Sequence, residues 1–169
     1  FKGAPKFPQL YIFDPIFYFY NKNKKNTFLD VVRKLLNNIS SKGIYDHLGG
    51  GISRYTVDEK WIIPHFEKML YDNILFVRTV NNYLVNKQDK KLNDKLIQTI
   101  NFINNEFINN KNLLGSAYDA DSEGVEGKYY VWSNEEIEGL LGNDIDIFKK
   151  KYLVTKDGNF EGSNILVEN

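Results

Sequence analysis

Residues 43–73 read GIYDHLGGGISRYTVDEKWIIPHFEKMLYDN, and the interpretation of the whole chain starts from this stretch. It contains both histidines of the chain, three consecutive glycines and a mixture of charged and aromatic residues. Glycine permits positive φ and lets other groups approach the backbone closely. Such a composition is poorly suited to a core, and it predicts the lining of a pocket.

The first regular structure expected in this stretch is a β-hairpin. Residues 52–57 predict one strand and residues 61–63 its return, with the turn at 58–60. The glycines at 49–51 come directly before the first strand.

A helix is expected to begin where the hairpin ends. Pro64 suits the first turn of a helix, because its missing N–H would be unpaired there in any case. We therefore expect a helix from Pro64 to about Asn86, with His65 and Glu67 at its N-terminal mouth. A helix N-terminus is a suitable place for a polar or anionic ligand.

The segments on either side predict amphipathic helices. A first helix should open with Asp14 as its N-cap, and a fourth should span about 92–108. A second helix should run from Asn26 or Thr27 to Gly43. Its apolar stripe consists of Phe28, Val31, Val32, Leu35, Leu36 and Ile39. Short loops between such helices favour antiparallel packing.

A second polar segment follows the helices. Residues 114–117 and 128–132 are expected to be strands on either side of an acidic loop at 119–127. Ser133 and Glu136 have the spacing of a capping box, which predicts a short helix that ends near Gly142. Another short helix is expected over 144–152.

Composition and charge exclude several classes of site. The 169 residues include 22 Lys+Arg and 22 Asp+Glu, so nothing in the net charge of zero favours a nucleic-acid or membrane partner. The absence of cysteine excludes disulfides and thiolate zinc sites within the sequence. No apolar run approaches the ~18 residues that span a bilayer. The opening FKGAPKFPQ, without an initiator Met, suggests a fragment or a processed product.

The acidic loop has three possible readings. Asp119, Asp121 and Glu123 imitate the start of an EF-hand calcium loop, but its twelfth position would be Tyr130 instead of Glu. A carboxylate-lined loop that binds polyol hydroxyls and a simple solvated turn are the alternatives.

The central cluster also leaves alternatives open. His47, His65 and Glu67 could form a zinc site with an open position, although their spacing matches no helix-borne zinc motif. The sequence HFE at 65–67 resembles the deaminase H-x-E, whose cysteine half is absent here. The other readings are residues that merely join the hairpin to the helices, and a site for a neutral polar ligand such as a sugar. Flat apolar faces for a sugar ring would come from Tyr45, Tyr55, Trp61 and Tyr71. Hydrogen bonds would come from Asp46, Arg54, Glu67 and Asp72.

Four segments together resemble one protein family. They are GAPKFP at 3–8, the stretch 43–73, SAYDADSEGVEGKYYVWSNEE at 116–136 and NFEGSNIL at 159–166. In order and spacing they resemble spermatogenesis-associated protein 20 of animals and its bacterial thioredoxin-domain-containing relatives.

This resemblance implies a fold. Family members look like a thioredoxin-like domain followed by an (α/α) toroid of the six-hairpin glycosidase type, similar to N-acylglucosamine 2-epimerases. Residues 1–169 would be a single partial domain, the N-terminal part of that toroid, without the thioredoxin-like domain and the remaining hairpins. The expected fold class is therefore mainly α, a partial toroid of antiparallel helical hairpins with short β-hairpin excursions. Those excursions would be loops of a ligand-binding funnel.

The resemblance also implies site residues. The first motif, residues 43–73, matches the family at Asp46, His47, Arg54, Trp61, His65, Glu67, Lys68, Tyr71 and Asp72. The second motif, residues 116–136, matches the family at Asp119, Asp121, Glu123, Glu126 and Tyr130. The candidate catalytic residues are His65, Glu67 and Asp72. The candidate substrate-binding residues are Asp46, His47, Arg54, Trp61, Tyr71, Asp119, Asp121 and Glu123. No metal ligand and no cofactor is predicted.

Three functional hypotheses remain open from the sequence. The chain could belong to a sugar epimerase, isomerase or hydrolase in which His65 is the general acid/base. It could be a non-catalytic binding module that holds a carbohydrate or a peptide beside a thioredoxin-like domain. It could also be inactive as an isolated segment, because an incomplete ring leaves an open edge. For a bacterial parent the default compartment is the cytoplasm.

Overall fold

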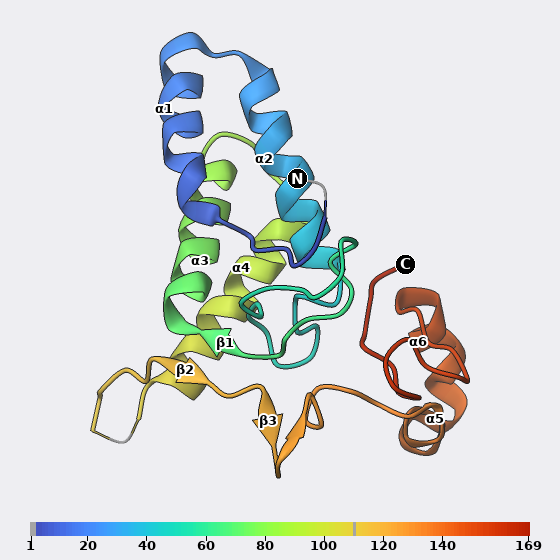
Figure 1. Ribbon diagram of the computed structural model, residues 1–169. Coiled ribbons are helices and arrows are strands. Elements are labelled where there is room, and N and C mark those ends of the chain that lie inside the picture. The colour runs from blue at the N-terminus through green and yellow to red at the C-terminus, as the bar shows by residue number, and fades with distance from the viewer. Residues whose placement is uncertain (1–2, 110) are drawn as a thin grey trace.

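The computed structural model describes residues 3–109 and 111–169, and about half of the chain is helical (Figure 1). Four longer helices form two hairpins: α1 (Phe13–Asn23) with α2 (Asn26–Ser41), and α3 (Leu70–Leu84) with α4 (Lys90–Phe102). In each hairpin the second helix returns antiparallel to the first after a short connection. Two shorter helices, α5 (Asn134–Leu141) and α6 (Ile145–Lys151), lie beyond a glycine-rich excursion. The expectation of a mainly α chain is confirmed.

The main core lies between the four longer helices. The predicted apolar stripe of α2 is confirmed at Val32, Leu36 and Ile39, which are buried, and in part at Phe28 and Leu35, which are half-buried. Val31 is exposed, and Leu29, which was not in the predicted stripe, is buried. The helices α3 and α4 add Phe76, Val80, Tyr83 and Leu92 to the same cluster. Burial of such side chains is the main favourable term in the stability of this part.

The first helix begins two residues earlier than expected. A short 3-10 turn, η1 (Leu10–Ile12), leads directly into α1, so Ile12 takes the N-cap position and Asp14 lies within the first turn. The Asp14 carboxylate instead accepts a hydrogen bond from Arg78 at 2.7 Å.

The expected strands at 52–57 and 61–63 do not form. Asp58 accepts hydrogen bonds from the backbone N–H groups of Lys60, Ile62 and Ile63, which makes a side-chain-closed loop. Trp61 has a φ of 68°, which is incompatible with a continuous strand. Only a single bridge between Thr56 and Pro64 closes the loop.

The helix expected from Pro64 begins at Leu70, so His65 and Glu67 do not lie at a helix mouth. Backbone groups of this segment are bonded elsewhere: His65 N–H donates to Tyr55 C=O, and Glu67 C=O accepts from Arg54 N–H. Phe66 has a φ of 60°, in the left-handed region. These long-range bonds override the local signal of Pro64.

The segment before α3 is instead a short strand. Strand β1 (Lys68–Met69) pairs antiparallel with β2 (Ala117–Tyr118), so that Lys68 lies opposite Tyr118. The first backbone N–H of α3, from Leu70, donates to Ser116 C=O at 2.9 Å. This pairing brings the first motif against the second.

The second excursion also differs from the expectation. The expected strand at 114–117 forms only at its end, as β2, which pairs with β1. The hairpin consists instead of β3 (Asp121–Ser122) and β4 (Val125–Glu126), inside the acidic segment. Glu123 and Gly124 connect them with φ values of 54° and 77°, as a two-residue type I′ hairpin loop requires. No strand forms at 128–132.

The capping box before α5 is confirmed, because the Ser133 hydroxyl accepts from Glu136 N–H and the Glu136 carboxylate accepts from Ser133 N–H. The helix α4 is shorter than expected. It ends at Phe102 and continues as a π-helical turn, η2 (Ile103–Phe107). A further 3-10 turn, η3 (Gly142–Asp144), joins α5 to α6.

The last residues return to the helical bundle. The apolar run Ile165–Val167 is buried, and Glu168 N–H donates to Ser41 C=O at the end of α2. The tail therefore joins α6 to the first hairpin. Within the described residues, no helix has the length and apolar character needed to cross a membrane.

A candidate ligand site between the two motifs

Two adjoining cavities lie where the first motif meets the second, and they enclose about 400 and 390 Å³. Their shared lining comes from both motifs: Asp46, Gly49, Lys68, Ser122, Tyr129 and Tyr130. The larger cavity adds Glu123, Lys128, Trp132 and Glu136, and the smaller one adds Glu106, Tyr118, Asp119 and Asp121. Cavities of this size are typical of small-molecule sites.

Lys68 is the centre of this region, and its side chain is 2 % exposed. Its ammonium donates to Asp46 Oδ2 at 2.7 Å and to Gly50 C=O at 2.9 Å. The Nζ atom also lies 4.4 Å from the centroid of the Phe102 ring and 4.7 Å from that of Tyr130. Burial lowers the pKa of Lys68, and the Asp46 carboxylate opposes that shift.

Asp46 is held in place for this contact. Its Oδ1 atom accepts hydrogen bonds from Leu48 N–H at 3.0 Å and Gly49 N–H at 2.9 Å. A Cβ at position 49 would lie 2.8 Å from Asp46 Oδ2, so glycine is required there for the carboxylate to reach Lys68. The glycine run thus positions an acid, as well as permitting a turn.

Aromatic rings form the wall beside Lys68. Tyr130 stacks on Phe66 with 5.8 Å between ring centroids. Burial raises the pKa of the Tyr130 hydroxyl to about 12, so this group is a neutral hydrogen-bonding phenol at pH 7. Gly127 allows Phe66 to approach, because a Cβ there would lie 2.4 Å from the ring. A charged pair beside flat apolar faces can orient a polar ligand and cover its less polar side.

His65 is joined to the second motif and not to Glu67 or Asp72. Its Nδ1 atom lies 2.9 Å from Glu126 Oε1, and its ring stacks on Tyr55 at 4.8 Å. A carboxylate that holds one imidazole nitrogen leaves the other free to exchange protons, which is the usual arrangement of a general base. His65 does not line either of the two cavities.

Glu67 and Asp72 belong to a separate cluster around Arg54. The Arg54 guanidinium donates to Glu67 Oε2 at 3.1 Å. Burial raises the pKa of Asp72 to about 6, and the Arg54 charge opposes the shift. Among the described residues, neither Asp72 Oδ2 nor Arg54 Nε has a hydrogen-bond partner. The three predicted catalytic residues are therefore distributed over two clusters.

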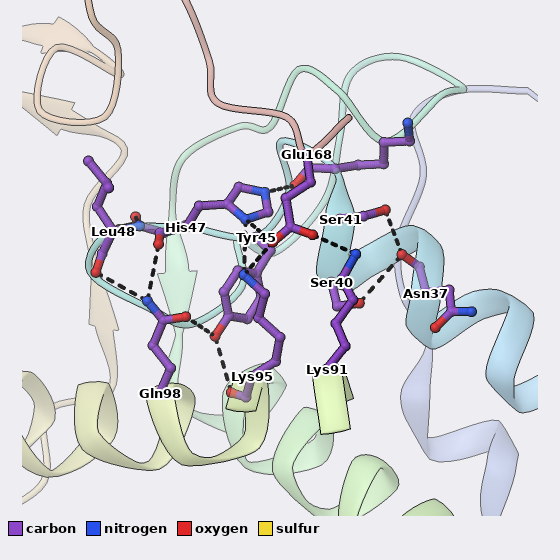
Figure 2. A network of polar contacts seen from close by, with 12 residues as sticks. Asn37, Ser40, Ser41, Tyr45, His47, Leu48, Lys91, Lys95, Gln98 and Glu168 are labelled. Carbon is purple, nitrogen blue, oxygen red and sulfur yellow. Dashed lines mark hydrogen bonds and ion pairs between the residues drawn. The ribbon is translucent and has the colours of Figure 1, made fainter. Parts of the chain in front are cut away.

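His47 is buried in a polar network between helices (Figure 2). Its Nε2 lies 3.1 Å from Lys42 C=O, which can only accept, so Nε2 carries the proton and Nδ1 accepts from Lys95 Nζ at 3.0 Å. Burial and the Lys95 charge lower the pKa of His47 to about 4. The contact of Nδ1 with Glu168 Oε1 at 3.3 Å therefore joins a neutral ring to a carboxylate and is not an ion pair.

The remaining predicted residues are placed differently. Trp61 lies in the main core, while Tyr71 is exposed on the first turn of α3. Asp119 and Asp121 line the smaller cavity and Glu123 the larger one. Glu123 is also bonded to Lys128.

Tyr129 lines both cavities and was not predicted at all. Lys68 and Tyr130 also line both; they match the family motifs but were not named as substrate-binding residues. The signal for Lys68 is an alternation: Pro64, Phe66 and Lys68 are all buried. Read as an extended segment, this pattern would have pointed the lysine inward with its apolar neighbours.

No group of three or more His, Asp or Glu side chains suitable for a metal ion occurs in residues 3–109 and 111–169. The site as described therefore consists of an ion pair, carboxylates, phenols and aromatic faces. These groups can bind a neutral polar molecule by hydrogen bonds and ring contacts.

Comparison with known proteins gives relatives over most of the chain. An uncharacterized protein of Caenorhabditis elegans is 34% identical over 157 residues, which is 85% of this chain and 21% of that protein. Human spermatogenesis-associated protein 20 is 28% identical over 183 aligned residues, 96% of this chain and 23% of that protein. The rat protein of the same name is 30% identical over 151 residues, 83% of this chain and 19% of that protein.

The chain is a homologue of spermatogenesis-associated protein 20. It spans about a fifth of the length of these relatives. No family model matches the chain.

Proposed function

We propose that the two adjoining cavities bind a small neutral polar ligand of the carbohydrate class. The observation that carries this proposal is the position of the Asp46–Lys68 pair in the lining of both cavities, beside Tyr129 and Tyr130. Ion pairs and carboxylates supply hydrogen bonds to hydroxyls, and aromatic faces cover the C–H side of a sugar ring. Residues of both sequence motifs would then serve one site.

Tyr129 offers a direct test, because it is 74% exposed and lines both cavities. We expect Tyr129→Ala to weaken the binding of mono- and disaccharides about tenfold, measured by calorimetry or by ligand-observed NMR, since a stacked aromatic face contributes about 1 kcal/mol or more. Tyr18→Ala is the matched control, because Tyr18 is 63% exposed on α1 and lines neither cavity. Equal effects of the two substitutions, or no binding of any sugar to a folded chain, would refute the proposal.

A second candidate function is general acid/base catalysis by His65, and the observation that favours it is the 2.9 Å contact with Glu126. In an epimerase, isomerase or hydrolase of sugars, Glu126 would orient the imidazole. Because His65 lines neither cavity, the sugar would have to extend beyond them to reach it. Glu126→Gln should then lower kcat for such a sugar and leave its Kd unchanged. Loss of binding without loss of kcat would refute this assignment.

We also propose a larger context for the chain. The antiparallel pairs α1–α2 and α3–α4 are consistent with hairpins of an (α/α) toroid of the six-hairpin glycosidase type. Because the chain spans about a fifth of its relatives, the remaining hairpins and a thioredoxin-like partner domain would lie in the rest of the longer protein. A structure of a complete relative tests this, since a different fold next to α3 and α4 would exclude the toroid.

A further inference from the structure

A third hollow, of about 640 Å³, lies on another part of the molecule and is rich in lysine. Its walls come from one face of α4, the end of α6 and the tail. Five lysines line it: Lys90, Lys91, Lys95, Lys150 and Lys151. The only acids in its lining are Asp94 and Glu168, which is a strong local excess of positive charge in a chain whose net charge is zero.

Glu168 neutralises only part of this charge. Its Oε2 accepts from Lys91 at 2.5 Å and its Oε1 from Lys95 at 3.1 Å, as Figure 2 shows. Burial by itself would raise the pKa of Glu168, but the two lysines lower it to about 2, so the carboxylate is fully ionised at neutral pH. Both oxygens of Glu168 are thus occupied by the two lysines of α4.

The other three lysines have no such partner. Within residues 3–109 and 111–169, no carboxylate lies within 4.0 Å of the ammonium groups of Lys90, Lys150 and Lys151. Lysines from α4 and α6 line the same hollow, so positive charges from two helices converge there. Like charges brought together destabilise each other unless an anion lies between them.

Helix stability does not account for this arrangement. Lysines in the last turn of α6 suit the negative end of that helix, and Lys149 is also paired with Glu138. Lys90 and Lys91, however, occupy the first turn of α4, where the helix dipole disfavours positive charge. The N-terminal end of α4 already has an acid, since the Asp89 side chain is the N-cap and accepts from Leu92 N–H at 3.2 Å. An anion in the hollow would therefore be attracted mainly by the lysines that line it.

We propose that this hollow binds a phosphate group or a similar oxyanion, either as the free ion or as part of a small phosphorylated molecule. Lys90, Lys150 and Lys151 would contact the anion, and the Lys91–Glu168–Lys95 contacts would hold α4 and the tail around it. This site is separate from the two carbohydrate cavities. Of its lining residues, only His47 also lines one of them, the larger cavity.

The test is an NMR titration of the 169-residue chain with inorganic phosphate and, separately, with glucose 6-phosphate. We expect saturable shifts confined to the amides of residues 90–98, 150–152 and 168–169. The double substitution Lys150→Gln/Lys151→Gln should weaken binding about tenfold, because two charge-assisted contacts are lost. Lys90→Gln, on the opposite wall, is an independent variant in case the double variant folds poorly.

Lys24→Gln/Lys25→Gln is the matched control, since it removes two adjacent lysines in the connection between α1 and α2. Binding of both probes would identify phosphate itself as the recognised group, and binding of glucose 6-phosphate alone would identify a phosphorylated molecule. Glucose, which has no phosphate group, is the third probe. Shifts that glucose also causes are assigned to sugar binding and not to the lysine-lined hollow, so the two proposals can fail independently. Non-saturable shifts, equal loss in the control, or binding of an RNA oligonucleotide without binding of either phosphate probe would overturn the proposal.

Discussion

Lys68 and Lys95 are both buried lysines, but different kinds of partner compensate their positive charges. Both ammonium groups are almost removed from water, and burial lowers both pKa values. Lys68 is paired with Asp46, an acid from the same sequence motif that the glycines hold in place. Lys95 is paired with Glu168, an acid from the other end of the chain, and with a neutral histidine. The first pair lies in the lining of the candidate ligand site, whereas the second joins distant segments.

This difference predicts that the Lys68 pair is the more costly one to break. Asp46→Ala leaves an ammonium that is 2 % exposed with only Gly50 C=O and two rings as partners. We expect the free energy of unfolding to fall by about 3 to 5 kcal/mol, measured by urea denaturation. Lys68→Met is the informative counterpart, because Asp46 keeps its two backbone hydrogen bonds. A larger loss in Lys68→Met than in Asp46→Ala would contradict this account.

The Lys95 region should make stability depend on pH through His47. The pKa of His47 is about 4 in the folded chain and 6.5 in the unfolded chain, so the unfolded chain binds more protons between these values. The His47 contribution to stability is therefore fully present above pH 6.5 and decreases by about 3 kcal/mol as the pH falls to 4. Asp72 acts in the opposite direction over much of this range, because burial raises its pKa to about 6, so a comparison with His47→Gln is needed to isolate the histidine. Denaturation curves at several pH values measure this slope.

His65 provides the control for that slope, since it is the only other histidine and is partly exposed. His47→Gln should remove the His47 contribution, so the stability of this variant relative to the unmodified chain should rise as the pH falls from 6.5 to 4, and His65→Gln should show no such relative change. If the slope followed His65 instead, the assignment of His47 as a neutral buried acceptor would be wrong.

Glu168→Gln should lower the free energy of unfolding by less than Asp46→Ala and by more than Lys91→Gln. The amide keeps the shape of the side chain but removes the charge that Lys91 and Lys95 share, so we expect a loss of about 2 kcal/mol at pH 7. The difference from the unmodified chain should shrink as the pH falls from 4.5 towards 2, where Glu168 itself becomes protonated. A constant difference over that range would show that the charge of Glu168 is not what stabilises the tail.

Lys91→Gln should have the smallest effect in this series. Its side chain is 51% exposed, and exposed ion pairs contribute no more than about 1 kcal/mol. The same denaturation assay, repeated at high salt, should abolish most of the difference. A loss as large as that of Glu168→Gln would mean that Lys91, and not Lys95, is the principal partner of Glu168.

The sequence predicted the parts of the fold that depend on local patterns. The stripe of α2 and the capping box at Ser133 are determined by residues three or four positions apart, and both are confirmed. The helix start at Pro64 was wrong, because His65 and Leu70 donate their N–H groups to Tyr55 and Ser116, far away in the sequence. Local propensity cannot report such partners.

The candidate site was predictable to a similar degree. The motifs that contain Asp46 and Glu123 were identified from their composition, and the structure brings both to one cavity. The partner of His65 was not predictable, because Glu126 reaches it only through the pairing of β1 with β2. The role of Glu168 was missed for the same reason, since no local pattern relates it to Lys95.

The return of the tail to Ser41 has a consequence for how the chain is made. Synthesis on the ribosome proceeds from the N-terminus, so the end of α2 and the buried His47 acquire Glu168 only after residues 48–167 have been added. Contacts between such distant residues form late, because a long loop must close first. A nascent chain stalled before residue 168 would therefore carry an uncovered pair of lysines on α4, and proteases should cut the released tail before they reach the helices.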